Sequence, residues 1–164
     1  MKDTDLAIVA LDAPRRAAPA NYPTELVARM GDREKRPLGD FFGLSTFGVN
    51  LTRLGPGAAT AFLHAHSRQD EFVYVLQGTP TLRTERGEAV LSPGMCAGFP
   101  AGGPAHHLVN ETRADILILE IGDRGANDHV RYPTEDLLSV TAEGGVRRFT
   151  RKDGSAFGEA EKGR

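Results

Sequence analysis

Three histidines and one glutamate have the residue types and the spacing of a divalent metal site. His64 and His66 are separated by one residue, Glu71 follows in the same segment, and His106 lies further along the chain. Alternate residues of a β-strand point to the same face, so the imidazoles of His64 and His66 can converge on one ion. Glu71 opens an apolar run and can reach the same ion from the next strand of a hairpin. We therefore predict that His64, His66, Glu71 and His106 bind one divalent metal ion.

The predicted ligand set contains nitrogen and oxygen donors and no thiolate. Such a set suits Zn, Mn, Fe or Ni, and also Co, and ligand chemistry alone does not choose among these metals. An ion that prefers more than four ligands keeps positions open for water, dioxygen or a chelating substrate. An open position permits chemistry, whereas a closed tetrahedral zinc site would indicate a structural role.

The segments around these residues have the pattern of short β-strands. From Leu44 onward, apolar and polar residues alternate in runs separated by glycine and proline turns, which predicts about eight strands and an all-β fold. The run from Ala59 to His66 is one of these predicted strands. A chain of 164 residues has the size of one domain.

The chain divides into three predicted parts. Residues 1–40 form an N-terminal arm that four prolines keep irregular, apart from one short helix near Glu25 to Met30. Residues 41–123 form the barrel that carries the metal site. Residues 124–164 form a mostly irregular C-terminal extension that packs on the barrel or trails from it, with a short helix or turn in residues 132–140.

Two longer motifs surround the predicted ligands. Residues 57–78 read G-x6-H-x-H-x4-E-x6-G, and residues 94–110 read G-x5-P-x-G-x3-H-x3-N. Each resembles one of the two motifs of the cupin superfamily, with one residue more than the commonest form. The strings LGDFFGLSTFGVNLTRLGPG, DEFVYVLQG and AHHLVN are similar to those of small single-domain bacterial cupins of the cupin 2 type. The resemblance implies a double-stranded β-helix, or jelly-roll barrel, with a metal at the four ligands, and it leaves the reaction open.

The fourth ligand has an alternative, because His106 and His107 are adjacent and a strand sends them to opposite faces. Counting back from Asn110 in the H-x3-N pattern favours His106. A bulge after Gly102 would exchange the two faces and select His107 instead.

The cavity of a small barrel is lined by inward-facing residues, and we expect a mostly apolar pocket with few polar groups. Arg53 could clamp a substrate carboxylate, but a charge at the barrel rim is the favoured interpretation. Asn50 has the opposite parity to Arg53, so only one of the two should face the cavity. Tyr74 should point outward. The cavity candidates are Asn50, Arg53, Phe62, Gln69, Val73, Phe99, Leu108 and Asn110, with Val75 also predicted to face inward.

Two functions of different class fit these observations. The first is a metal-dependent enzyme that acts on a small organic molecule, of the oxygenase, isomerase, decarboxylase or lyase type. The second is a non-enzymatic protein that binds a small molecule or a metal in the same cavity. No general acid or base can be assigned from the sequence, so the catalytic residues are unknown at this stage.

Composition restricts the partners. The formal net charge is -2 and both signs are interspersed, which does not favour a nucleic-acid-binding face. The single cysteine, Cys96, fits a reducing compartment and is predicted to be a small buried apolar residue. No apolar stretch is long enough for a membrane span or has the form of a signal peptide, so we expect a cytoplasmic protein. A homodimer is expected because small cupins tend to pair their sheets.

Overall fold

The computed structural model describes residues 6–16, 22–141 and 147–157, and within them the protein is nearly all β. The short helical elements are η1 (Ala10–Asp12), α1 (Thr24–Val27), η2 (Ala28–Met30) and α2 (Leu38–Phe41). The first six strands are β1 (Arg33–Pro37), β2 (Phe47–Leu54), β3 (Ala65–His66), β4 (Glu71–Gln77), β5 (Thr81–Thr84) and β6 (Gly87–Val90). The others are β7 (Cys96–Phe99), β8 (His106–Val109), β9 (Ile116–Asp123), β10 (His129–Arg131), β11 (Leu138–Thr141) and β12 (Arg147–Thr150).

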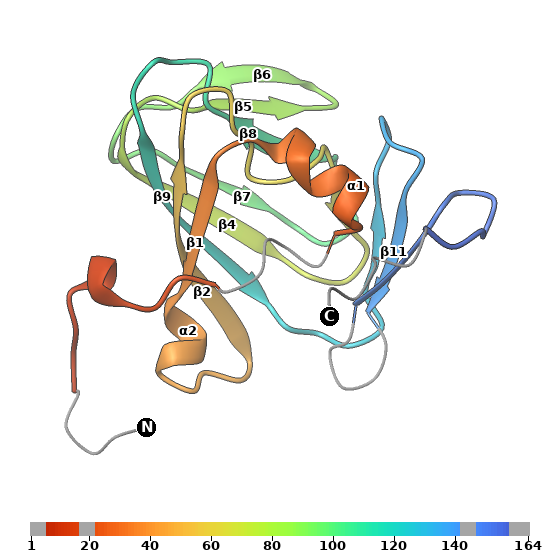
Figure 1. Cartoon of the computed structure of the whole chain (residues 1–164), viewed down its shortest axis with the longest axis horizontal. Helices are drawn as coiled ribbons and strands as arrows, with labels where there is room; N and C mark the ends of the chain where they lie inside the picture. The colour runs from red at the N-terminus through yellow and green to blue at the C-terminus, as the bar shows by residue number, and fades with distance from the viewer. Residues whose placement is uncertain (1–5, 17–21, 142–146, 158–164) are drawn as a thin grey trace, which may run out of the picture.

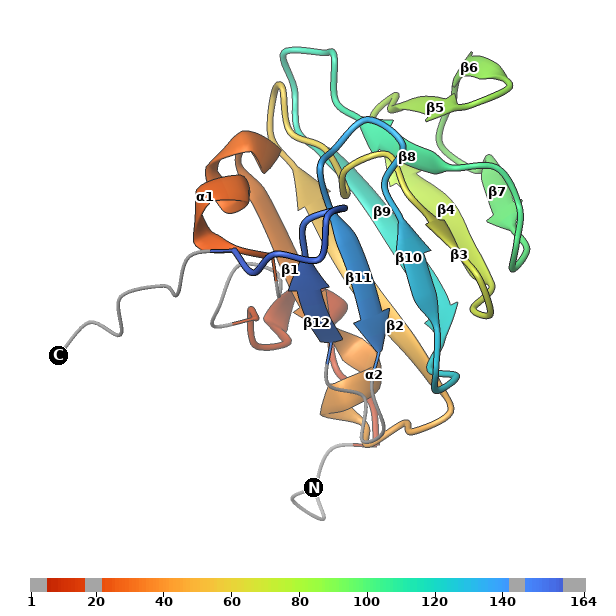
Figure 2. The same ribbon diagram turned by 90° about the vertical axis from the view of Figure 1, so that its right-hand side faces the viewer.

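The strands form three antiparallel sheets. The largest has the order β1-β2-β9-β4-β7, the second β12-β11-β10-β3, and the third β6-β5-β8. Figure 1 shows the five-stranded sheet crossing the molecule, with the β5–β6 hairpin beside one end. Figure 2 shows β10, β11 and β12 as a second layer in front of the five-stranded sheet. This layered arrangement is a jelly roll, as predicted.

Strand β4 shows how the sequence pattern determines the two faces of the large sheet. Val73 and Val75 are buried, at 5% and 0% exposure, whereas Phe72 and Tyr74 are each 38% exposed. The alternation follows from the pleat of the strand, which sends successive side chains to opposite faces. The predicted outward direction of Tyr74 is confirmed. The core inside the barrel consists of Leu54, Ala58, Val73, Val75, Leu91, Phe99, Leu108, Ile116 and Ile118.

The N-terminal part contains a strand that the sequence did not predict. Strand β1 pairs with β2 in a register that places Lys35 opposite Thr52 and Pro37 opposite Asn50. Its sequence REKRP has no apolar alternation, and its side chains take part in ion pairs such as that of Arg36 with Glu34, at 2.8 Å. The short helix expected near Glu25 to Met30 is present as α1 and η2.

The C-terminal part also contains unpredicted strands. Strands β10, β11 and β12 continue the sheet that begins at β3, with Val130 opposite His66. Val130 and Leu137 pack there in a second apolar cluster with Tyr132 and Phe62. Most of the described residues after Asp123 are irregular, as expected, but these three strands were not predicted, because they are short and are stabilised by partners distant in sequence. Division of the chain at residues 40 and 123 stays a prediction.

Two smaller expectations were also wrong. Of the predicted strand over residues 59–66, only β3 (Ala65–His66) is regular, and the rest touches β8 through isolated bridges at Ala59 and His64. Cys96 is exposed and not buried. It lies opposite Tyr74 in the pairing of β7 with β4, so it shares the outer face of the sheet, and Ala97 and Phe99 take the inner positions.

Among the described residues, the structure contains no helix that is long and apolar enough to cross a membrane.

Candidate metal centre

Three sheets supply the predicted ligands. His66 lies on β3, Glu71 begins β4 and His106 begins β8. His64 precedes β3 and forms a bridge with His106, with backbone N···O distances of 3.2 and 2.8 Å in the two directions. The expected hairpin between the strands of His66 and Glu71 was wrong, because β3 pairs with β10 and β4 pairs with β7 and β9. The ligands therefore approach from opposing layers.

The four side chains converge on a common point. Glu71 Oε2 lies 3.0 Å from His106 Nε2 and 3.2 Å from His64 Nε2, and Glu71 Oε1 lies 3.6 Å from His66 Nε2. The ligand atoms of His64, His66 and Glu71 all lie within 4.8 Å of one another. The three histidines are buried, at 8%, 6% and 5% exposure for His64, His66 and His106.

The other ring nitrogen of each histidine is held by an oxygen acceptor. His64 Nδ1 lies 2.9 Å from the carbonyl oxygen of Phe62, and His106 Nδ1 lies 3.4 Å from that of Pro104. His66 Nδ1 lies 2.6 Å from Oδ2 of Asp128. A metal-bound histidine commonly donates its second ring N–H to such an oxygen, so these contacts suit imidazoles that bind a cation through Nε2.

The donor atoms at the centre of the site are of the kind that binds a cation. The Nε2 atoms of His64, His66 and His106 lie 3.2, 3.6 and 3.0 Å from carboxylate oxygens of Glu71. Burial raises the pKa of Glu71, but hydrogen bonds and charge from His106, His64 and His66 outweigh it and lower that pKa well below its usual range. Burial lowers the pKa of His66, which favours its neutral form. The donor set therefore fits a divalent ion, whose charge would be shared by all four groups.

Asp128 is a functional residue that the sequence did not indicate. It is fully buried, and its carboxylate accepts from Ser67 Oγ at 3.2 Å and from the backbone N–H of Arg68 at 2.9 Å, in addition to its contact with His66. It comes from the C-terminal part, just before β10. A single aspartate in that region carries no motif, so only the pairing of β10 with β3 reveals its position beside the metal site.

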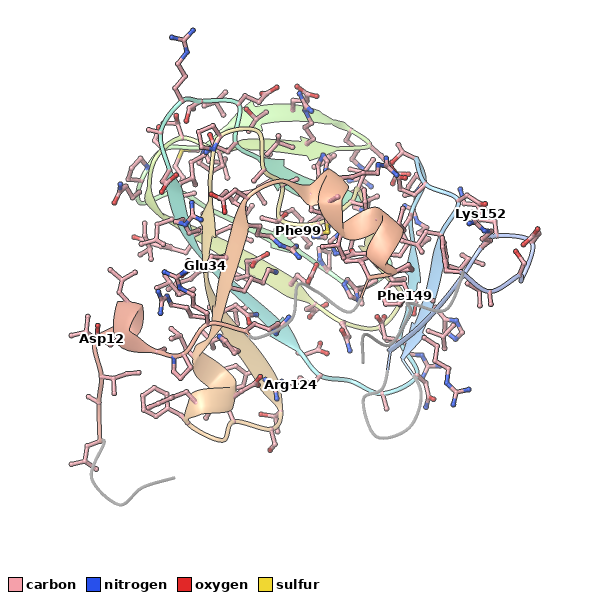
Figure 3. The ribbon with its side chains drawn as sticks, viewed as in Figure 1. Asp12, Glu34, Phe99, Arg124, Phe149 and Lys152 are labelled. Atoms are coloured by element: carbon pink, nitrogen blue, oxygen red, sulfur yellow. The ribbon has the colours of Figure 1, made fainter. Side chains whose placement is uncertain are left out.

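The adjacent histidines take different places. The ring of Phe99 stacks on His106 at a centroid distance of 3.5 Å and an interplanar angle of 5°, and Figure 3 shows Phe99 inside the barrel. His107 turns away, with Nδ1 3.0 Å from the carbonyl oxygen of Ala61. The structure thus brings His106 to Glu71, and it does not bring His107 there.

A cavity of about 650 Å³ opens beside His64, Glu71 and His106. Its wall includes Asn50, Gln69, Val73 and Leu108 from the predicted set. The expectation of a mostly apolar cavity was wrong, because charged and polar groups make up most of the wall. The unpredicted members that matter here are Arg16, Lys35, Asp40, Glu120, Asp123 and Arg124. Arg124, labelled in Figure 3, lies beside α2 and pairs with Asp40.

The remaining cavity candidates have other contacts. Arg53 forms ion pairs with Asp32 at 2.7 Å and Asp115 at 3.3 Å, in agreement with the favoured rim position. Asn110 is fully buried, and its amide donates to the carbonyl oxygens of Leu54 and Ala114, so it fixes a loop.

Three predicted apolar residues, Phe62, Val75 and Phe99, are also absent from the cavity wall. Phe62 packs in the second apolar cluster, and Val75 lies in the barrel core. Phe99 contributes through its stacking on His106.

Comparisons with known proteins agree with this architecture. The family profile described as a cupin domain matches residues 50–122. A crystal structure from Silicibacter pomeroyi, named as a sugar phosphate isomerase from a cupin superfamily, is 41% identical to this chain with a TM-score of 0.84. The alignment covers 92% of this chain and 96% of that one. The chain therefore belongs to the cupin superfamily and is a small protein of the cupin 2 type.

Two further structures extend the comparison. One from Acidithiobacillus ferrooxidans, whose name also refers to a sugar phosphate isomerase, is 32% identical over 73% of this chain and 76% of its own, with a TM-score of 0.67. A polyketide cyclase from Streptomyces resistomycificus is 18% identical over 71% of this chain and 78% of its own, with a TM-score of 0.59, and shows a similarity of fold alone. No curated protein matches this chain.

Proposed function

We propose that this chain is a metal-dependent isomerase that acts on a phosphorylated sugar. The observation that carries the proposal is the polar wall of the cavity next to the converging ligands. A wall with charged and amide groups suits a hydroxyl-rich anionic molecule better than an apolar one. The name of the Silicibacter pomeroyi structure, which is 41% identical to this chain, supports the same substrate class.

His64, His66, Glu71 and His106 would hold the ion, of which Zn, Mn, Fe and Ni are the candidates. The bound ion would supply Lewis acidity that polarises a chelating oxygen of the substrate. The chain itself orients the imidazoles through Phe62, Pro104 and Asp128 before any ion arrives. A site organised in advance loses little free energy to rearrangement when its ligand binds.

Arg16 is the residue that we assign to the phosphate. Its backbone N–H donates to the carbonyl oxygen of Lys35 at 2.8 Å, which places it beside β1. Lys35 and Arg124 also line the cavity, but each is paired with a carboxylate. Among the described residues, the guanidinium of Arg16 has no carboxylate partner. It is therefore the cation available to neutralise a phosphate at this end of the cavity.

The experiment is an assay of sugar phosphates with the protein loaded in turn with Mn, Fe, Co, Ni and Zn. Aldose and ketose phosphates of five and six carbons are followed by proton NMR. We expect one aldose–ketose pair to interconvert. An Arg16→Ala variant should raise KM for the phosphorylated sugar and leave the metal content unchanged. Tight binding of a sugar phosphate without interconversion by any metal form would refute the enzyme and favour the non-enzymatic binding protein.

We also propose that the chain forms a homodimer through the outer face of β4. Phe72, Tyr74 and Leu76 are 38%, 38% and 41% exposed there, and Met95 next to them is 44% exposed. An exposed apolar patch of this kind is typical of an association surface. Sedimentation should show a dimer that Tyr74→Glu dissociates, whereas Val90→Glu, at an exposed apolar position on β6, should leave it intact. A wild-type monomer at all concentrations would contradict the proposal.

A further inference from the structure

We propose that Glu120 is the catalytic base of the isomerisation and that Lys35 positions it. The inference rests on the proposed function and adds the group that moves the proton. The two residues form an ion pair on the cavity wall, in which Lys35 Nζ lies 2.7 Å from Oε2 of Glu120. The two side chains are each 18% exposed, so they are largely enclosed and still reach the cavity.

The sheet register places Glu120 near the metal ligands. Glu71 on β4 lies opposite Gly122 on β9, and Val73 lies opposite Glu120. Directly paired residues share a face, so Glu71 and Glu120 point to the same side of the sheet, one pair apart on the diagonal. Such diagonal neighbours lie about 7–8 Å apart, within the reach of long side chains. A small sugar that contacts an ion held by Glu71 would therefore lie beside Glu120.

The two oxygens of Glu120 differ in their contacts. Oε2 accepts from Lys35 Nζ and from the hydroxyl of Thr52, which is fully buried on β2. Within the part of the chain that the structure describes, Oε1 has no hydrogen-bond partner. Two donors thus fix the orientation of the carboxylate, and one oxygen stays free to accept a proton from a bound molecule.

Enclosing this ion pair costs desolvation free energy, and the fold does not require charged residues at these two positions. Its neighbours on the inner face, Val75 and Ile118, are fully buried apolar residues. Removing a lysine and a glutamate from water costs several kcal/mol per ion in general, and apolar residues of similar volume often stabilise a protein equally well at such positions. Catalytic use of the carboxylate explains why charged residues occupy this part of the wall.

Isomerisation requires a proton to move from C2 to C1 of the sugar, and we assign this transfer to Glu120. Its carboxylate takes the proton from C2 of the aldose, the C–H electron pair becomes the C1–C2 double bond, and the carbonyl oxygen at C1 takes a proton from water. Glu120 then returns its proton to C1, and the hydroxyl at C2 gives a proton to water as the ketose carbonyl forms. One proton enters and one leaves, and no oxidant or reductant is needed.

The test compares wild type with Glu120→Gln in D2O, using the sugar phosphate that the wild type interconverts. A proton held by Glu120 exchanges with solvent before it returns, so wild-type product should carry deuterium at C1. Glu120→Gln should lower kcat by about 100-fold or more, because a positioned base contributes about 10²–10⁴ in rate. The metal content should stay stoichiometric. Calorimetry should show unchanged affinity for sorbitol 6-phosphate, which has no carbonyl group and binds without reacting.

Three further variants complete the design. Glu88→Gln removes an exposed carboxylate on β6 and should behave as wild type. Lys35→Met should lower kcat and leave the affinity for sorbitol 6-phosphate unchanged, because the ammonium group orients the carboxylate of Glu120 without binding the substrate. Glu120→Asp keeps the charge but draws the carboxylate back by one methylene, so kcat should fall even if Glu120→Gln does not fold.

The outcomes separate this inference from the proposed function. Isomerisation by wild type without deuterium in the product, or a wild-type kcat in Glu120→Gln or Glu120→Asp, overturns the role of Glu120 alone. Loss of sorbitol 6-phosphate binding in Glu120→Asp at full metal content also overturns it, because it shows a binding role. Absence of any interconversion by wild type overturns the proposed function, and this inference with it.

Discussion

Replacing Asp128 with Asn should weaken metal binding without removing a ligand. The buried carboxylate of Asp128 accepts from three donors, at His66 Nδ1, Ser67 Oγ and the backbone N–H of Arg68. An amide has one oxygen, so its NH2 group must face at least one of these donors. If it faces His66, the ring is no longer held in the orientation that directs Nε2 to the ion.

The expected loss of metal affinity is estimated from similar hydrogen bonds that hold metal-ligating histidines in other proteins. Loss of such a partner typically lowers metal affinity by about 10–100-fold, which corresponds to about 1.4–2.7 kcal/mol. The contact between Asp128 and His66 is short, at 2.6 Å, and fully buried, so we expect a value in the upper half of this range.

The assay is a competition titration of Zn2+ and Mn2+ against a chromogenic chelator. Ser67→Ala is the matched control, because it leaves His66 in place and removes the longest of the three contacts of Asp128, at 3.2 Å, together with the acceptor of the backbone N–H of His129. Melting of the metal-free proteins separates a loss of stability from a loss of affinity. Equal affinities in wild type and Asp128→Asn would refute the view that Asp128 orients His66.

Two further predictions concern stability. An ion at 100 times its dissociation constant stabilises a fold by about 2.7 kcal/mol, so a chelator should lower the melting temperature of the loaded wild type and leave His66→Ala unaffected. Equal shifts in both proteins would place the ion elsewhere. The hydrogen bonds from Arg131 and from the backbone N–H of Ala105 lower the pKa of Glu85 to about 2. A lowered pKa contributes stability that is present above the ordinary value and is lost as the pH falls through about 2. Urea unfolding should therefore show wild type to be more stable than Glu85→Gln at neutral pH, with the difference vanishing toward pH 2, and a difference independent of pH would contradict this assignment.

The fold class and the four candidate ligands could be predicted because local constraints determine their spacing. The pleat of a strand relates His64 to His66, and the glycines of the motifs occur where the backbone needs them. Gly78 has φ of +80°, and a Cβ there would lie 2.7 Å from Cγ1 of Ile116. Ligand and turn positions of this kind can be recognised from the residue types alone.

The missed residues depend on pairing between distant segments. Lys35 reaches Glu120 only because β1 adds to the edge of the large sheet, and Asp128 reaches His66 only because β10 pairs with β3. Neither strand has an apolar alternation long enough to identify it. The error at Cys96 has a related cause, since a short strand without a known register leaves its inward face undetermined.

The charged residues of the cavity wall, apart from the ligand Glu71, come from other stretches of the chain than the metal ligands. The four ligands lie between residues 64 and 106, whereas Arg16, Lys35, Asn50 and Glu120 lie outside this interval. Evolution can therefore change the molecule that is recognised while the metal ligands stay intact. A directed-evolution library confined to β1, β2 and β9 would explore new substrates without sacrificing the ion, and small barrels of this type are well suited to acquire new specificities in this way.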